Sequence, residues 1–288
     1  KVAHFSQPPN SSAIFFREKC IFPPFSSFHP FFRGKNRGKA YFLPYFRRML
    51  LQDQILVLRT LRYADDRLIV EALARTHGRV SFMVRITHSP RATVRHTLFT
   101  PLAVIDTEWN RPRTGQLGKP LAARVAQPRL TLHTMPAKTA VVLFLAEMLL
   151  HVVHSEEADE KVFDFVAAAL QWLDTAERDY ANFHLVFLMR LTRFLGIAPD
   201  LSQAGLPYFD LVGGRFAGVR PMHTHILEGE EAKVFANLLR MNFSTMHLFR
   251  FSRAQRNRIL DVLIVYYRLH LAAMPELKSP DVLRALFD

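Results

Sequence analysis

The chain has 288 residues, a formal net charge of +13 and 49% hydrophobic residues. This length allows two domains with a substantial core, and the single cysteine, Cys20, excludes an internal disulfide and a zinc site built from cysteines. One cysteine also fits a reducing cytoplasm, and no apolar run reaches the roughly 18 residues of a membrane span.

The positive charge is concentrated in the first half of the chain. Residues 1–48 carry a net charge of +8, residues 49–130 a net charge of +7, and residues 131–288 a net charge of −2. A basic segment followed by a nearly neutral one indicates a domain that binds a polyanion, attached to a second domain with another task.

Residues 1–48 have an unusual composition. They contain ten of the 25 phenylalanines, six prolines and one acidic residue, and no strand or helix period persists in them. The first methionine is Met49, and a well-patterned strand follows it. We expect an upstream extension that is disordered or not native. The alternatives are a basic targeting segment and a DNA-binding arm.

Residues 49–130 have the pattern of short strands. Residues 55–60, 68–75 and 79–86 form three of them, separated by the turn-like sequences YADD and THG. A basic loop then joins a fourth strand, 102–109, to residues 121–126, which form a fifth strand or a short helix. Five short strands and basic loops are typical of a small closed barrel such as an OB-fold.

The first three strands are rich in arginine. Residues 57–85 hold six arginines but only three acidic residues. In the third strand, Phe82 and its apolar neighbours occupy one face, and Arg79 and Arg85 occupy the other, because side chains alternate along a strand. The arginine face should meet solvent or phosphate. Each arginine taken alone is also compatible with an ordinary solvated surface charge.

Residues 131–288 have a helical period, so we expect an all-α domain after the barrel and an α+β protein overall. Residues 196–216 are interpreted as a turn-rich connection. The helix signals are Pro136 at a first helical position, segments 161–174 and 182–196 (closed by Gly196), segment 230–240, a capping box of Ser252 and Gln255, and Ser279 followed by proline.

No pattern in the sequence indicates catalysis. Nucleotide-binding loops are absent, and neither a nucleophile–base pair nor paired carboxylates can be argued from spacing. The histidine pairs His151/His154 and His223/His225 have no further ligands beside them. We therefore expect no enzyme activity, no metal and no cofactor, although a dispersed active site remains an alternative.

Several segments together resemble the RecO family of DNA-repair and recombination mediators, over residues 49–288. The segments that carry the resemblance are ILVLRTLRYADDRLIVEALARTHGRVSFMV (55–84), PAKTAVVLFLAEMLLHVV (136–153), NFHLVFLMRLTRFLGIAPD (182–200), YFDLVGGRF (208–216) and YYRLHLAAMPELKSPDVLRALF (266–287). Each is moderately specific, and their order and joint presence make the match.

The resemblance implies an N-terminal OB-fold and a C-terminal helical domain. It further implies binding of single- and double-stranded DNA, annealing of complementary strands, and partnership with RecR and with the acidic–hydrophobic tail of single-stranded DNA-binding protein. The outcome would be loading of RecA onto gapped DNA, with a functional link to RecF, in the cytoplasm at the nucleoid. No cysteine follows Cys20, so the chain resembles the zinc-free members.

The resemblance gives the arginines of the basic domain a role in binding phosphate, which the planar guanidinium group binds bidentately. The arginines expected to do so are Arg59, Arg62, Arg67, Arg79, Arg85, Arg91 and Arg95. Tyr63 and Trp109 are candidates for stacking on bases, whereas Phe82 is expected in the core.

A site for the tail of single-stranded DNA-binding protein requires a cation beside an apolar hollow. Lys138 in the first helix and Arg190 and Arg193 in the third are the candidates. For each of them, an ordinary charge on a helix surface is the alternative. The alternative function for the whole chain is an RNA-binding OB module with a helical scaffold, and a preference for structured RNA would favour it.

Overall fold

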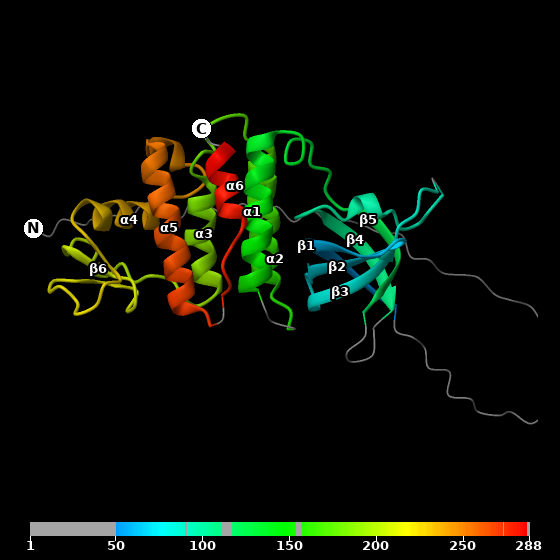
Figure 1. Cartoon of the computed structure of the whole chain (residues 1–288), viewed down its shortest axis with the longest axis horizontal. Helices are drawn as coiled ribbons and strands as arrows, with labels where there is room; N and C mark the ends of the chain where they lie inside the picture. The colour runs from blue at the N-terminus through cyan, green and yellow to red at the C-terminus, as the bar shows by residue number, and fades with distance from the viewer. Residues whose placement is uncertain (1–49, 90, 111–116, 154–156, 273, 287–288) are drawn as a thin grey trace, which may run out of the picture. The chain divides into compact units, whose positions relative to one another are not determined.

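The computed structural model describes residues 50–89, 91–110, 117–153, 157–272 and 274–286 (Figure 1). All of these residues fall in a single unit of the chain, Arg47–Asp288. The expected extension, residues 1–48, lies outside the described residues, as does most of the loop expected between the fourth and fifth strands.

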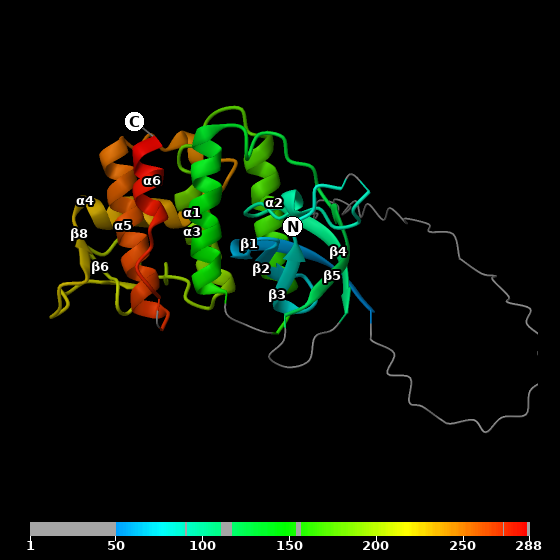
Figure 2. The same cartoon turned by 45° about the vertical axis from the view of Figure 1, so that its right-hand side comes forward.

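Five antiparallel strands form the first sheet, in the order β3-β2-β1-β4-β5 (Figures 1 and 2). The expected strands are confirmed, and residues 121–126 contribute to a strand and not to a helix. Strand β1 continues through Tyr63, which the sequence pattern had placed in a turn. The strands are β1 (Leu50–Ala64), β2 (Arg67–Ala74), β3 (Gly78–Arg85), β4 (Val104–Asn110) and β5 (Lys119–Val125).

The two outer strands of this sheet meet at Gly118. A parallel bridge joins Gly118 to Phe82. The backbone N–H of Met83 donates to the Gly118 carbonyl at 2.9 Å, and the Gly118 N–H donates to the Ser81 carbonyl at 2.8 Å. The sheet therefore curves far enough for β3 to contact the start of β5, around an inner core that includes Phe82 and Trp109.

Gly118 has no space for a side chain, and this leads to a prediction. A Cβ at this position would lie 2.9 Å from Cδ1 of Phe82, which is 1% exposed. Gly118→Ala should therefore lower the free energy of unfolding by about 1–3 kcal/mol, the usual cost of overpacking a core. Urea unfolding checks this, with Gly205→Ala as control, because a Cβ at Gly205 meets nothing within 4 Å. Equal stability of the two variants would contradict the prediction.

In the described residues, six helices follow the first sheet, and their sequence signals are confirmed. Pro136 is at the start of α1, Gly196 follows α3 with a φ of +72°, and both hydrogen bonds of the Ser252–Gln255 capping box are present. The helices are α1 (Pro136–Val152), α2 (Glu160–Thr175), α3 (Phe183–Phe194), α4 (Glu230–Arg240), α5 (Arg253–His270) and α6 (Ser279–Leu286).

The prediction of an all-α second domain is wrong, because a three-stranded sheet lies between α3 and α4. Its order is β7-β6-β8, with β6 (Tyr208–Asp210), β7 (Arg215–Ala217) and β8 (Ile226–Glu228). Each strand buries only its central residue, so no period of two could be recognised in the sequence. The sheet and helices together nevertheless give the expected α+β class.

Strand β1 is buried on both faces where it passes the helices. Ile55 and Val57 belong to the inner core of the first sheet, and Leu56 and Leu58 belong to the core of the helices. Two-sided burial explains why the chain reads as an unbroken apolar run at this point. The basic sheet is therefore packed on the helices through a shared core and is not tethered as a separate module.

Polar contacts hold the segment between β5 and α1. The guanidinium group of Arg129 donates to the Leu102 carbonyl at 2.8 Å and to the Ala167 carbonyl at 3.3 Å, and burial lowers its pKa to about 10. The carboxylate of Asp174 on α2 accepts hydrogen bonds from three successive backbone N–H groups, those of residues 130–132. The segment is thus hydrogen-bonded to Leu102, just before β4, and to two residues of α2, Ala167 and Asp174.

Candidate nucleic-acid interface

The outer face of strands β1, β2 and β3 carries arginines and apolar residues in rows. Side chains in register on neighbouring strands share a face, and those that alternate with the inner core point outward. The register places Arg59 beside Glu71 and Ser81, Leu61 beside Ile69 and Met83, and Arg67 beside Arg85. An apolar row therefore lies between two rows that contain arginine, and we call this surface the arginine face.

At one end of the arginine face, Asp66 lies between two guanidinium groups. Its carboxylate is 3.6 Å from Nε of Arg67 and 3.3 Å from Nε of Arg85. The Arg67 side chain is 53% exposed and the Arg85 side chain 82% exposed. One carboxylate cannot satisfy the five N–H donors of each guanidinium group, so both retain donors for a phosphate.

At the other end of the arginine face, Arg59 and Arg79 share Glu71. Both guanidinium groups donate to this carboxylate. Burial would raise the pKa of Glu71, but the hydrogen bonds from Arg59 and Arg79 outweigh it and hold the pKa below its ordinary value. Glu71 is therefore ionised near neutral pH, and the group of three carries one net positive charge. Arg59 remains 44% exposed.

The apolar row was missed by sequence reasoning, which treated the strands singly. Leu61 is 41% exposed and Tyr63, two residues further along β1, is 63% exposed. Ile69 and Met83 are half-buried beside Leu61. The signal in the sequence is the alternation of β1, which continues past residue 60 into Tyr63, the first residue of the predicted turn. Exposed apolar and aromatic side chains between cations can contact unpaired bases.

Arg79 does not face solvent as expected. One of its terminal nitrogens donates to the carbonyls of Leu150 and Val153, at 2.9 and 3.3 Å, at the C-terminal end of α1. Backbone carbonyls at this end of a helix lack intrahelical partners and carry a partial negative charge, which attracts a cation. Arg79 therefore links β3 to α1, an outcome that strand alternation alone could not reveal.

This position leads to a prediction for Arg79. Arg79→Gln should lower the free energy of unfolding by about 1–3 kcal/mol, because buried carbonyls lose a charged donor. The salt dependence of nucleic-acid binding should stay the same, since no phosphate contact is removed. Urea unfolding and a salt series of binding measurements check both parts. A flatter salt dependence at unchanged stability would show that Arg79 contacts phosphate.

The other three arginines expected to bind phosphate lie away from the arginine face. Arg62 is opposite Leu68, toward the inner core side of the sheet, and donates to the Asp65 carbonyl at 3.3 Å. Arg91 and Arg95 are exposed in the segment between β3 and β4. The structure thus brings together Arg59, Arg67 and Arg85, and separates them from these three.

The aromatic residues considered for base stacking fall into two groups, buried and exposed. Phe82 lies in the inner core, as expected. Trp109 is only 1% exposed and packs edge-on against Phe82, with ring centroids 5.3 Å apart, so this candidate for stacking on bases belongs to the inner core. Tyr63 is the candidate that stays accessible.

Lys138 does not lie on the surface, which corrects its assignment to a partner site. Its side chain is buried, and its ammonium group donates to Oγ1 of Thr131 at 2.8 Å and to the Asp174 carbonyl at 3.0 Å. Burial lowers the pKa of Lys138. The lysine stabilises the junction of α1 and α2, while Arg193 is exposed and Arg190 is half-buried.

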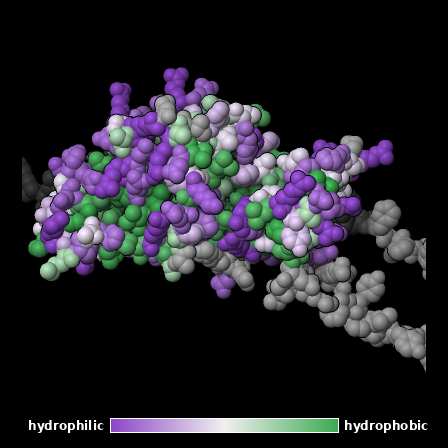
Figure 3. Space-filling view, in the orientation of Figure 1, coloured by the Kyte–Doolittle hydropathy of each residue, from purple (hydrophilic) through white to green (hydrophobic). Residues whose placement is uncertain are grey.

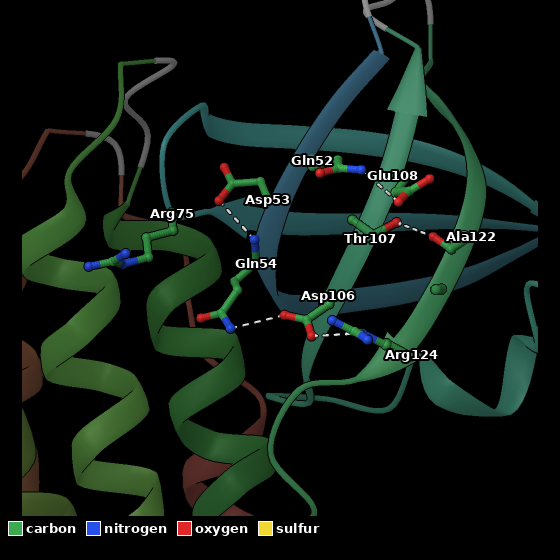
Figure 4. A pocket seen from close by; sticks show the side chains of 10 residues that line it. Gln52, Asp53, Gln54, Arg75, Asp106, Thr107, Glu108, Ala122 and Arg124 are labelled. Atoms are coloured by element: carbon green, nitrogen blue, oxygen red, sulfur yellow. Dashed lines mark hydrogen bonds and ion pairs between the residues drawn. The ribbon is translucent and has the colours of Figure 1, made fainter. Parts of the chain in front are cut away.

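A second surface of the first sheet, formed by β1, β4 and β5 and called here the β4–β5 wall, carries carboxylates (Figure 4). A hollow of about 590 Å³ there is lined by Gln54, Asp106, Glu108 and Arg124, among others. Gln54 and Arg124 both donate to Asp106, at 2.9 and 3.0 Å. The carboxylates of this wall disfavour phosphate, so the arginine face is the better candidate for a polyanion.

The surface around α4, α5 and β6 is apolar in part, as Figure 3 shows. A groove of about 310 Å³ between α4 and α5 is lined by Val234, Phe235 and Ile259, with Glu230 and Glu231 also lining it. Its acidic residues make it unsuitable for phosphate. Within the described ranges, no group of three potential metal ligands is present, and no helix is long and apolar enough to cross a membrane.

Comparisons with known proteins agree along nearly the whole described chain. The family model for the N-terminal part of recombination protein O matches residues 49–129, and the model for its C-terminal part matches residues 133–280. A DNA repair protein RecO from Bacteroides fragilis is 43% identical over 244 residues, which cover 83% of this chain and 100% of the relative. Relatives of the same name from Phocaeicola vulgatus and Porphyromonas gingivalis are 41% and 33% identical, with the same coverage.

Proposed function

The chain belongs to the RecO family of DNA-repair proteins, and on that basis we propose that it is a non-catalytic recombination mediator. In this role it binds single- and double-stranded DNA and anneals complementary strands in the cytoplasm, at the nucleoid. The observation that carries the proposal is the arginine face, where Arg59, Arg67 and Arg85 flank an exposed apolar row.

We further propose that the first sheet is an OB-fold. Support comes from its five antiparallel strands and from the contact between β3 and the start of β5 at Gly118, which brings the two edges of the sheet together. In such a barrel the outer surface of neighbouring strands is available to a nucleic acid, while the inner core keeps the surface rigid.

On the arginine face, Arg59 and the pair of Arg67 and Arg85 would bind phosphates on either side of the apolar row. Leu61, and Tyr63 near the end of β1, would contact the bases. Neither contact reads a base edge, so binding should tolerate any sequence. Arg62, Arg91 and Arg95 lie off this face and are proposed to contact further phosphates of a longer or double-stranded DNA.

The partners follow from the family and are proposed for this chain in the same way. They are RecR and the tail of single-stranded DNA-binding protein, with RecA loaded onto gapped DNA as the outcome and a functional link to RecF. Of the three cations expected to receive the acidic tail, Lys138 is buried, and Arg190 and Arg193 remain as candidates.

Fluorescence anisotropy of labelled single-stranded DNA against the full chain, over a range of salt concentrations, tests the proposal. We expect tight binding at low salt and a steep loss of affinity as salt rises, because bound phosphates release counterions. An unlabelled structured RNA serves as competitor. Stronger competition by the RNA than by single-stranded DNA would favour an RNA-binding module, and no binding of DNA at low salt would refute the proposal.

A further inference from the structure

Six aromatic rings pack together on α2, α3 and the segment after α4, and we call them the aromatic column. Its members are Phe165 and Trp172 of α2, Phe183, Phe187 and Phe194 of α3, and Phe243. The α3 rings follow a spacing of four and then seven residues, and the α2 rings a spacing of seven. Each set therefore lies on one face of its helix.

Most ring pairs of the aromatic column are close to parallel, whereas the buried Phe187 is tilted by 31° from Phe165 and by 37° from Phe183. Trp172 and Phe183 are inclined by 6°, Phe183 and Phe243 by 23°, and Phe165 and Phe194 by 28°, with centroids 5.8, 5.0 and 4.8 Å apart. In the inner core of the first sheet, by contrast, ring pairs meet nearly at right angles. A set of parallel rings presents aromatic faces in one orientation, which is what a stacking base requires.

Part of the aromatic column is accessible. Phe183 and Phe187 are fully buried, but Phe194 is 37% exposed, and Phe165, Trp172 and Phe243 are half-buried. Trp172 and Phe243 also border a hollow of about 390 Å³. This volume falls in the range of about 300–1,000 Å³ that is usual for small-molecule sites. An outer layer of rings can therefore be reached by a flat ligand.

Arginines accompany the rings at the Phe194 end of the column. Arg190 lies on the same face of α3, between Phe187 and Phe194, and donates to the Met241 carbonyl at 3.1 Å. Its Nε is buried and has no hydrogen-bond partner within the described ranges. Burial, and then the charge of Arg193, lower the pKa of Arg190. In the part of the chain that the structure describes, no carboxylate forms an ion pair with Arg190 or Arg193.

The two ends of the aromatic column differ in charge. The hollow at the Trp172 end is bordered by Glu177 and Asp179 as well as by Arg178 and His247, so it has no excess of positive charge. The unbalanced positive charge lies at the Phe194 end, with Arg190 and Arg193. A ligand that suits both ends has an uncharged flat part and an anionic part, as a nucleotide unit has.

We propose that the aromatic column is a second binding site for single-stranded nucleic acid. Unpaired bases stack on Trp172 and Phe243, and phosphates bind Arg190 and Arg193. The acidic–hydrophobic tail considered above would also suit these arginines, but its one apolar end would cover a single ring. Several near-parallel rings suit a run of stacked bases better, so they favour a nucleic acid. The inference rests on the proposed function for the class of ligand and adds a site that is separate from the arginine face.

Tryptophan fluorescence tests this site, because the chain has only two tryptophans, Trp109 and Trp172. The full chain carrying Trp109→Phe, with Arg67→Gln and Arg85→Gln to weaken the arginine face, is titrated with oligothymidylate. We expect the emission of Trp172 to be quenched to a plateau. Phe243→Leu, which keeps an apolar side chain but removes the ring, should then weaken binding about 5- to 150-fold.

Anisotropy on the chain that retains both tryptophans provides a second measurement, in case Trp109→Phe fails to fold. Arg193→Gln should weaken binding and flatten its salt dependence, and Arg268→Gln, an exposed arginine of α5, should change neither. Binding lost in the column variants but kept in the arginine-face variants would uphold this site and overturn the arginine face.

Three results would overturn the second site. One is unchanged Trp172 emission while anisotropy reports bound DNA, and another is loss of all DNA binding when only the arginine face is altered. Both would leave the proposed function in place. The third is quenching by an acidic peptide with an aromatic end but not by oligothymidylate, which would identify the aromatic column as a peptide site.

Discussion

Replacing Arg67 and Arg85 together by glutamine is expected to weaken the binding of single-stranded DNA about 25-fold at 0.1 M salt. Each guanidinium group that binds a phosphate adds roughly 0.7 to the slope of log K against log salt, so the slope should also fall by about 1.4. Both side chains are more than half exposed and share one carboxylate, Asp66, so neither of the two substitutions should disturb the fold. Anisotropy over a salt series measures both quantities.

Arg124 provides a matched control for this experiment. Its side chain is 82% exposed, like that of Arg85, and it too pairs with a single carboxylate, Asp106. It lies on the β4–β5 wall, where carboxylates line the surface. Arg124→Gln removes one charge, as Arg85→Gln alone does, and should leave affinity and slope nearly unchanged, whereas Arg85→Gln alone should lower the slope by about 0.7. Equal losses in the two variants would mean that total charge, and not the arginine face, determines binding.

The largest expected loss of stability comes from Asp174. Its carboxylate accepts hydrogen bonds from three backbone N–H groups, at 2.8 to 3.1 Å, and from the hydroxyl of Thr131. In Asp174→Asn, the amide nitrogen would point a donor at those donors. We expect a loss of about 2–4 kcal/mol in the free energy of unfolding, because three backbone N–H groups, that of Leu132 buried and the others partly buried, are left without an acceptor. Urea unfolding near neutral pH measures it.

The effect of Asp174 should depend on pH in one direction. Burial would raise the pKa of Asp174, but its hydrogen bonds from residues 130–132 outweigh this and hold the pKa below the ordinary value of 3.8. The unfolded chain therefore takes up a proton first. The stabilisation is fully present above the unfolded pKa, and it is lost as pH falls through the lower, folded pKa. The difference between the wild-type chain and Asp174→Asn should accordingly shrink below about pH 4.

Asp281 serves as the control for this prediction. Its side chain is 84% exposed and pairs with Arg284 on the same helix. Asp281→Asn should change the free energy of unfolding by no more than about 0.5 kcal/mol. If Asp174→Asn is no more destabilising than this control, the carboxylate does not anchor the segment between the sheet and the helices.

The sequence by itself determined the features that depend on local chemistry. The strands β1–β5 followed from a period of two and from the turn residues between them. The ends of α1, α3 and α5 followed from Pro136, Gly196 and the Ser252–Gln255 box, because caps satisfy backbone groups within a few residues of themselves. The concentration of positive charge in residues 49–130, from which a polyanion is predicted as ligand, required no coordinates.

Only the tertiary structure decided which charged side chains and aromatic rings are exposed and which are held by contacts inside the protein. Arg79 and Arg85 lie on the same face of one strand, yet Arg79 reaches the end of α1 and Arg85 reaches solvent. The sequence around Lys138 fits a lysine on a helix surface. Its ammonium group instead donates to the backbone carbonyl of Asp174, 36 residues away. The aromatic column joins two helices to Phe243, which lies far along the chain. In each case, the partner is distant in sequence, and packing alone brings it into contact.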